Sequence, residues 1–486
     1  MNTFVGCSYI LLENCISWDS KMEELMDRAR RVIEHFAIEK KDFLDVRFFL
    51  GEATTINIRN GTAEHISSES NIGAALRALI GGAWGFSTTK SFEEKDLLAA
   101  METAVSAARA MKKYIGESGT VPDKYVYKGV APLKVRTDPR EIALEDKIKV
   151  AVELEKNIRK DERIKVSQAS LTDIVQREVI VNSLGTEVDV SNCYVRVGGN
   201  AVAREGTLIQ NASDSVGTSR GWETVEEVDP AELGTRVGDR AVALLSALSP
   251  PSGRMNLIMD PGLVGVFIHE AFGHAAEADG VLGNMSVLRG KIGKQVGVLG
   301  VTVIDDPTME GLRGSFPYDS EGTKTRRRVI VKDGILREYY QSLETAAKMG
   351  AEPNGAGRAM DFNFKPIPRM GNTFIEGRDM SFEELCQEVK EGVYLVKSYG
   401  GYVNPAIGQF YFTAQEGYLI KDGEVGPLTQ NVSMSGLTLE VLSNIIGIGK
   451  EVKMAFPGTC GKAGQSAPVS GGGPHLAVAN VVVGGR

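Results

Sequence analysis

Cysteine is scarce in this sequence, with five residues in a chain of 486. The number is odd and the spacing is not that of a disulfide framework, which suits a reducing compartment such as the cytoplasm. The sequence also lacks any apolar run of the roughly 18 residues that a membrane span requires. Its first 20 residues lack the basic start and the small-residue cleavage site of a secretory signal. We therefore expect a cytoplasmic protein with no membrane partner.

An excess of basic residues is absent as well. The formal net charge is −8, whereas a nucleic-acid partner usually requires a basic face. The one short basic run, residues 324–328, is more simply explained as a solvated loop. Hydrophobic residues at 42% and charged residues at 24% are ordinary for a globular protein. We expect no nucleic-acid partner and, from the length, two domains.

A linker rich in proline, serine and glycine, residues 249–253, predicts the domain boundary. The predicted fold class is α+β. We expect an N-terminal extension of unknown role (1–21), a domain of curved antiparallel sheets with helices (22–248), and a β-rich catalytic domain (254–486). The order of elements in the first domain hints at an internal duplication. Its strands are expected at the following ranges: 45–50, 54–59, 164–173, 176–182, 186–192 and 194–203. The glycines of 71–89 predict a bent strand or the close approach of another chain.

The stretch from Asp260 to Asp279 predicts a buried helix that carries polar chemistry. Asp260 suits the N-cap and Pro261 the first helical position. The residues that follow are apolar on every side of the helix, which is typical of burial. Three polar residues, His269, Glu270 and His274, interrupt this pattern. Burying them without partners would cost several kcal/mol, so we expect that they bind a metal ion.

The spacing of the two histidines is unusual for a metal helix. In HExxH the histidines share one helical face and the glutamate is the general base. Here the pattern is HExxxH, which separates the histidines by about 140° on an ideal helix. Both reach one ion only if the helix carries an extra residue, as in a π-bulge, and Gly273 would permit that distortion. The alternative is two core histidines bonded to backbone carbonyls.

A catalytic zinc site usually has three protein ligands and an open position. Cys460 is one candidate for the third ligand, because glycines flank it and Lys462 would favour the thiolate. His475 is the other candidate, and the spacing alone does not choose between them. Glu277 and Asp279 could support His274 from behind or merely solvate the helix end.

Five motifs together carry a resemblance to a known family: GAWGF (82–86), HEAFGHAAEADG (269–280), YDSEG (318–322), KSYGGYVNP (397–405) and PGTCGKAGQS (457–466). In this order they resemble the TldD/PmbA family of metalloproteases over nearly the whole chain from Met22. The chain is similar to the catalytic, TldD-like branch, because the PmbA-like branch lacks the metal motif. Two stretches depart from the family pattern: the segment before Met22 and the loop at 400–403.

The resemblance implies that His269, His274 and Cys460 bind Zn²⁺ and that Glu270 is the general base. A lesser role for Glu270 would be to hold a ligand histidine. The implied activity is hydrolysis of peptides or unfolded polypeptides, by a homodimer or a heterodimer with a PmbA-like paralogue. The alternatives are a non-catalytic, zinc-stabilised peptide-binding scaffold and a metal-dependent amidase.

Three further residues are candidates for substrate binding. Asp319 and Glu321, in the YDSEG motif, could orient ligands or bind a peptide amine, and turn formation explains them equally well. Arg358, in the NGAGR loop, could contact substrate or be structural.

Overall fold

The structure is a computed structural model that describes residues 18–36, 38–39, 42–114, 121 and 125–484. The predicted N-terminal extension therefore lies mostly outside the described residues. The first helix begins at Trp18, within the range 1–21 that the sequence assigns to the extension. Among the described helices, none has both the length and the apolar character needed to cross a bilayer.

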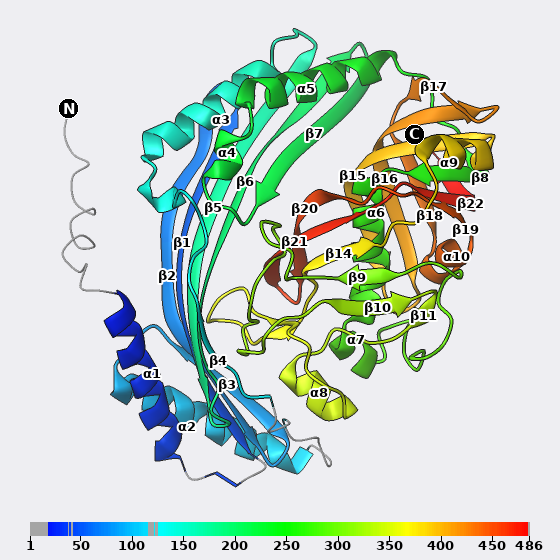
Figure 1. Ribbon diagram of the computed structural model, residues 1–486. Helices are drawn as coiled ribbons and strands as arrows, with labels where there is room; N and C mark the ends of the chain where they lie inside the picture. The colour runs from blue at the N-terminus through cyan, green and yellow to red at the C-terminus, as the bar shows by residue number, and fades with distance from the viewer. Residues whose placement is uncertain (1–17, 37, 40–41, 115–120, 122–124, 485–486) are drawn as a thin grey trace, which may run out of the picture.

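The N-terminal half is a long, curved sheet with helices packed at its two ends (Figure 1). Its strands are β1 (Phe43–Arg59), β2 (Thr62–Ile80), β3 (Ala83–Thr89), β4 (Lys128–Ala131), β5 (Ile164–Asn182), β6 (Glu187–Glu205) and β7 (Leu208–Thr218). Its helices are α1 (Trp18–His35), α2 (Glu94–Met111), α3 (Leu144–Ile158), α4 (Glu223–Glu226) and α5 (Pro230–Ala243), with 3-10 turns at Lys112–Tyr114, Pro139–Glu141 and Leu244–Ser246. The strands run in the order β3-β2-β1-β5-β6, and both β7 and β4 pair with β6 at different points along it.

The long strands are continuous where the sequence predicts breaks. We expected two strands in each of the segments that form β1, β5 and β6, but each segment is one strand. The burial pattern explains the error: the first residues of β1 are buried on both faces, whereas the later ones alternate between buried and more exposed. The change in pattern marks the passage along one strand from a two-sided core to a half-covered surface, and not a turn.

Two similar units make up this sheet. The first runs α1-β1-β2-β3-α2 and the second runs α3-β5-β6-β7-α5, with the short α4 before α5. The antiparallel pairing of β1 with β5 joins the two units at the centre of the sheet. Separate apolar cores lie under α1 and α2 and under α3 and α5. This arrangement is the one that the expected duplication would produce.

The glycines of 71–89 accommodate this chain's own elements. A Cβ on Gly85 would lie 1.8 Å from the carbonyl oxygen of Ala104 in α2. A Cβ on Gly73 would lie 2.4 Å from the ring of Phe362, in the C-terminal half. Both glycines are thus explained by packing within the chain. Residues 71–89 form the end of β2, a turn at Gly81 and Gly82, and β3, and not the single bent strand that the sequence predicts.

The C-terminal half is built from two sheets and a short strand pair. The first sheet contains β8 (Gly253–Met259), β15 (Gly392–Asn404), β16 (Gln409–Lys421), β17 (Glu424–Thr429), β18 (Val432–Leu437), β19 (Ile445–Ile448) and β22 (Leu476–Gly484). The second contains β9 (Val303–Asp305), β10 (Arg328–Lys332), β11 (Ile335–Leu336), β14 (Asn372–Ile375), β20 (Lys453–Lys462) and β21 (Gln465–Gly473), and the pair is β12 (Gly357–Arg358) with β13 (Ile367–Pro368). The helices are α6 (Pro261–Phe267), α7 (Ala278–Leu282), α8 (Leu343–Met349), α9 (Phe382–Val389) and α10 (Thr438–Ser443).

Helix α6 lies at the centre of this half and contacts strands of both sheets, including β15, β20 and β21. The whole C-terminal half sits inside the curve of the N-terminal sheet, with β20 and β21 between that sheet and α6 (Figure 1). A buried ion pair joins the halves, because Arg77 of β2, which also binds Asp45 of β1, binds Glu321 at 2.7 Å. The fold therefore places the metal helix beside the concave face of the sheet.

Candidate metal centre

The helix that carries the histidines begins as the sequence predicts. The Asp260 side chain caps α6 by accepting a hydrogen bond from the Leu263 N–H at 2.7 Å, and Pro261 occupies the first turn. The same carboxylate accepts the Lys397 N–H at 3.0 Å, which fastens the start of the helix to β15. Every residue from Pro261 to Phe267 is buried.

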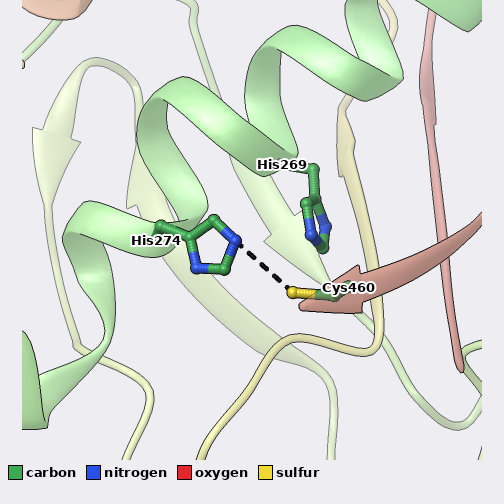
Figure 2. A group of neighbouring side chains, drawn as sticks. All are labelled: His269, His274 and Cys460. Carbon is green, nitrogen blue, oxygen red and sulfur yellow. Dashed lines mark hydrogen bonds between the residues drawn. The ribbon is translucent and has the colours of Figure 1, made fainter. Parts of the chain in front are cut away.

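The predicted helix distortion is confirmed. Residues Ile268–Gly273 form a π-helical turn, and the His274 N–H donates to the carbonyl of His269, five residues earlier. This bond places the two histidines one turn apart on the same side of the helix, with ring centroids 5.3 Å apart (Figure 2). Gly273 has ordinary helical angles (φ −58°, ψ −48°). Its role is steric instead, because a Cβ there would lie 2.0 Å from Met370 Sδ.

Cys460, in β20, faces the two histidines. Its Sγ lies 3.4 Å from His274 Nε2, and the donor atoms of His269, His274 and Cys460 all lie within 4.8 Å of one another (Figure 2). The other candidate, His475, lies elsewhere: its Nε2 is 3.1 Å from the Tyr394 hydroxyl, and its ring packs on Phe382. Of the two candidates for a third ligand, the fold brings Cys460 to the histidines.

The donor set fits a zinc ion. The His269 side chain is completely buried, and neither of its ring nitrogens has a hydrogen-bond partner among the described residues. Leaving such a group unsatisfied costs about 1–3 kcal/mol, and a metal ion bound to one nitrogen would remove much of that cost. Two imidazoles and one thiolate are ligands that zinc accepts. Among the described residues, the ligand atoms that converge here come from His269, His274 and Cys460, the three-ligand set of an open catalytic site.

The surroundings of Cys460 and His274 shift the pKa of both side chains. Burial alone would raise the pKa of the Cys460 thiol, but the adjacent imidazoles of His269 and His274 stabilise the thiolate and lower the pKa to about 5. Burial opposes the charged form of His274, yet the carboxylate of Glu277 and the sulfur of Cys460 raise its pKa well above the usual value. Before any metal binds, the pair is therefore an imidazolium facing a thiolate at neutral pH.

Glu277 supports His274 from behind, as the sequence suggested. Its Oε2 accepts a hydrogen bond from His274 Nδ1 at 2.8 Å, which leaves Nε2 facing the metal position. Lys462 Nζ lies 3.0 Å from the same oxygen and 2.7 Å from Asp279 Oδ1. Burial would raise the pKa of Glu277, but His274 and Lys462 lower it to about 2. Lys462, expected beside the thiolate, thus acts on the opposite side of His274.

Glu270 lies at the open side of the group. Its Oε2 is 3.7 Å from His274 Nε2, the nitrogen that faces Cys460, and its side chain is 32% exposed. A carboxylate that is both near the donor atoms and accessible to solvent can exchange protons with a water in the site. The position agrees with the predicted general base.

Comparisons with known proteins identify the family. Models of PmbA/TldA metallopeptidase domain 1, central domain and C-terminal domain match residues 44–108, 137–245 and 252–485. A metalloprotease of Methanothermobacter thermautotrophicus is 36% identical over 92% of this chain and 96% of its own length. The chain belongs to the PmbA/TldD metallopeptidase family.

Other relatives extend the likeness. The zinc metalloprotease TldD homolog of Saccharolobus solfataricus is 29% identical over 91% of this chain and 96% of its own length. The crystal structure of TldE from Thermococcus kodakarensis superposes with a TM-score of 0.70 at 19% identity, covering 96% of this chain and 100% of that one. The mixed α/β fold is therefore that of the PmbA/TldD family.

The predicted substrate residues have structural partners in this family fold. The Asp319 carboxylate accepts backbone N–H groups of Glu321, Thr323 and Gly357. Glu321 binds Arg77 and the Leu343 N–H. Arg358 donates to the carbonyls of Met370 and Pro468 and lies over the Phe316 ring. These contacts favour the structural alternative, and the substrate role of the three residues stays a prediction.

The sequence did not reveal the residues that hold Cys460 in place. The Arg369 guanidinium donates to the Cys460 carbonyl at 2.5 Å, and Arg313 donates to the Gly458 carbonyl at 3.2 Å. Arg369 precedes Cys460 by 91 positions, so no local pattern could connect them. The Phe456 ring, edge-on to His269 at 6.2 Å between centroids, was missed for the same reason.

Proposed function

We propose that this chain is a zinc-dependent peptidase in which His269, His274 and Cys460 hold the metal and Glu270 is the general base. The observation that carries the proposal is the convergence of two imidazoles and a thiolate on one point, with a partly exposed carboxylate beside them. The names of relatives, metalloprotease and zinc metalloprotease TldD homolog, support the reaction class and the metal.

Each residue has a defined task in this proposal. A zinc ion in this site would polarise the scissile carbonyl and lower the pKa of a bound water. Glu270 accepts the proton of the attacking water and passes a proton to the leaving amine. Glu277 holds His274 in the tautomer that presents Nε2. The thiolate of Cys460 makes the site less cationic than one with three histidines, so a strong base at Glu270 matters more.

Peptides in extended form suit the surroundings of the site. Strand β20, which carries Cys460, is the last strand of its sheet in the described pairing order. A terminal strand can add an extended peptide with little demand on its side chains. This arrangement favours peptides and unfolded chains over the small-molecule substrates of the alternative metal-dependent amidase.

The competing proposal is a non-catalytic scaffold stabilised by structural zinc. A structural zinc is normally closed by four protein ligands. Among the described residues the group offers three, and His475, the one other candidate, bonds to Tyr394. The open position therefore favours the peptidase.

Metal analysis combined with a peptide-digestion screen tests the proposal. We expect about one zinc per chain and metal-dependent cleavage of unstructured peptides. The screen should be run with and without a co-expressed PmbA-like paralogue, because the catalytic chain is proposed to act as a dimer. A zinc-loaded protein that cleaves no peptide in either setting would favour the scaffold.

A further inference from the structure

A polar cavity of about 420 Å³ lies between the two halves of the molecule, next to the metal helix. Its outer wall is the concave face of the N-terminal sheet, including Arg196 of β6 and Asp214 of β7. Its inner wall includes Val266 of α6, Lys397 of β15 and Phe456 of β20. The volume falls within the usual range for small-ligand sites, about 300–1,000 Å³.

The cavity has an excess of positive charge. Of the described residues that line it, those with charged side chains are Arg196, Asp214 and Lys397. Asp214 is already neutralised, because Lys397 Nζ lies 2.6 Å and Arg236 Nε 3.0 Å from its carboxylate oxygens. Arg196 donates to the hydroxyl of Ser215 at 3.1 Å and forms no ion pair with a carboxylate in the described part of the chain.

A second guanidinium increases the positive potential near Arg196. Burial and the charge of Arg196 lower the pKa of Arg313 to about 10. The side chain of Arg313 is 4% exposed, and its Nη1 has no partner among the described residues. Burial also lowers the pKa of Arg196. A guanidinium removed from water without an anionic partner costs folding free energy. An anion bound in the cavity would offset that cost.

The cavity lies within reach of the proposed reaction. Val266 precedes His269 by three positions, so it lies roughly 4.5 Å before His269 along the helix and close to the same side. Phe456, which also lines the cavity, packs on the His269 ring. An extended peptide advances about 3.3 Å per residue. A group in the cavity would therefore lie about two or three residues from a scissile bond at the metal.

We infer that this cavity binds a carboxylate of the peptide substrate through Arg196, two or three residues from the bond that is cleaved. The inference rests on the proposed peptidase function and adds a preference to it. The carboxylate belongs either to the C-terminus of the peptide or to an aspartate or glutamate side chain. Both present the same planar anion to the guanidinium fork, which can bind it with two parallel hydrogen bonds.

Peptide binding to zinc-loaded Glu270→Gln protein tests the inference without requiring hydrolysis. The probes are fluorescent peptides of one neutral sequence. The first has a free C-terminus, the second is amidated, and a third set is amidated with a single glutamate placed at successive positions. Glutamine at the same positions supplies the neutral control. We expect one of the carboxylate series to bind about 10- to 100-fold more tightly than its neutral counterpart. The free-acid and glutamate arms show which source of the carboxylate is used.

The variants show whether Arg196 is responsible. Arg196→Gln should abolish the preference by weakening the acidic peptide alone, and Arg196→Lys should retain part of it. Arg204→Gln is the matched control, because Arg204 lies on the same strand, is exposed, and donates to the Gly206 carbonyl. In the otherwise native enzyme, Arg196→Gln should raise KM for the acidic peptide and leave kcat nearly unchanged. A structural defect would lower kcat for every peptide.

Two results would overturn the inference: equal binding of acidic and neutral peptides, or a preference that survives Arg196→Gln. The proposed function fails separately. Carboxylate-dependent binding without hydrolysis by the native protein would contradict the peptidase and leave the subsite intact. Hydrolysis by the native protein without a carboxylate preference would support the peptidase and contradict the subsite.

Discussion

At the scale of single residues, His274 and Cys460 form a charged pair that must lose a proton when zinc binds. The pKa of Cys460 is lowered to about 5, so at pH 7 the sulfur is already a thiolate. The pKa of His274 is raised, so its imidazole holds a proton that zinc must displace. Zinc affinity should therefore rise with pH through the neutral range and fall steeply toward pH 5, where Cys460 is protonated as well.

Calorimetry of zinc binding at pH 7 in buffers of different ionisation enthalpy measures this release. We expect about one proton per zinc. Glu277→Gln should reduce the number, because without the Glu277 carboxylate the pKa of His274 falls. Zinc binding with no proton release at pH 7 would show that His274 is neutral beforehand, contrary to this account.

The proposed metal ligands and the support of His274 by Glu277 could be predicted from the sequence, but the residues that position Cys460 could not. Three polar residues in an otherwise apolar helix indicated the site, because burial requires that they have partners. The sequence spacing did not distinguish Cys460 from His475 as the third ligand, whereas the family resemblance favoured Cys460. The fold places the Cys460 Sγ 3.4 Å from His274 Nε2. Arg369, by contrast, gave no signal, since its bond to the Cys460 carbonyl depends on how distant segments pack.

At the scale of secondary structure, helix α6 can approach β21 closely only because Gly265 of the helix faces Gly471 and Gly472 of the strand. A Cβ on Gly265 would lie 2.6 Å from the backbone carbon of Gly471 and 2.7 Å from the nitrogen of Gly472. Backbone atoms cannot move aside as a flexible side chain does. The helix and the strand that pairs with β20 are thus held at close range, which sets the distance between the histidines and Cys460.

Gly265→Ala should therefore lower the free energy of unfolding by about 1–3 kcal/mol, the usual cost of overpacking, and weaken zinc binding. Chemical denaturation and zinc titration measure the two effects. Gly262→Ala, in the same helix, is the matched control, because its nearest neighbour would be Asp260 Oδ2 at 3.4 Å. If the two variants have equal stability and zinc affinity, the close packing of α6 on β21 does not support the site.

Element types were easier to predict than element lengths. The cap residue Asp260 and Pro261 predicted the start of the metal helix, and the spacing of HExxxH predicted the extra residue in it. Strand continuity was missed at Gly51, which lies in the middle of β1. There a Cβ would meet the Phe49 ring at 2.7 Å, so the glycine serves packing within a strand and does not end it.

At the scale of the whole molecule, the N-terminal sheet curves around the half that contains the metal site (Figure 1). Sequence patterns predicted two parts but not this enclosure, because nothing local relates Arg196 to the metal helix. We propose that a dimer, formed with a second copy or with a PmbA-like paralogue, further restricts access. The dimer, like the cytoplasmic location, stays a prediction.

Restricted access predicts a strong preference for unfolded substrates. A globular protein should resist cleavage, whereas the same protein held unfolded by reduction or mutation should be cut. Digestion of such a matched pair, with the oligomeric state measured by light scattering under the same conditions, tests both points. A monomer that cleaves the folded and unfolded forms at equal rates would contradict the restricted-access account.

We propose that His269, His274 and Cys460 hold zinc and that Glu270 is the general base. The most direct test is to measure zinc content and peptide hydrolysis together in the native protein, Glu270→Gln and Cys460→Ser. Glu270→Gln should keep zinc at the native level and lose at least about 100-fold in kcat, as expected for removal of a general base. Cys460→Ser should lose zinc while remaining folded. Full activity in Glu270→Gln with normal zinc, or unchanged zinc affinity in Cys460→Ser, would contradict the account.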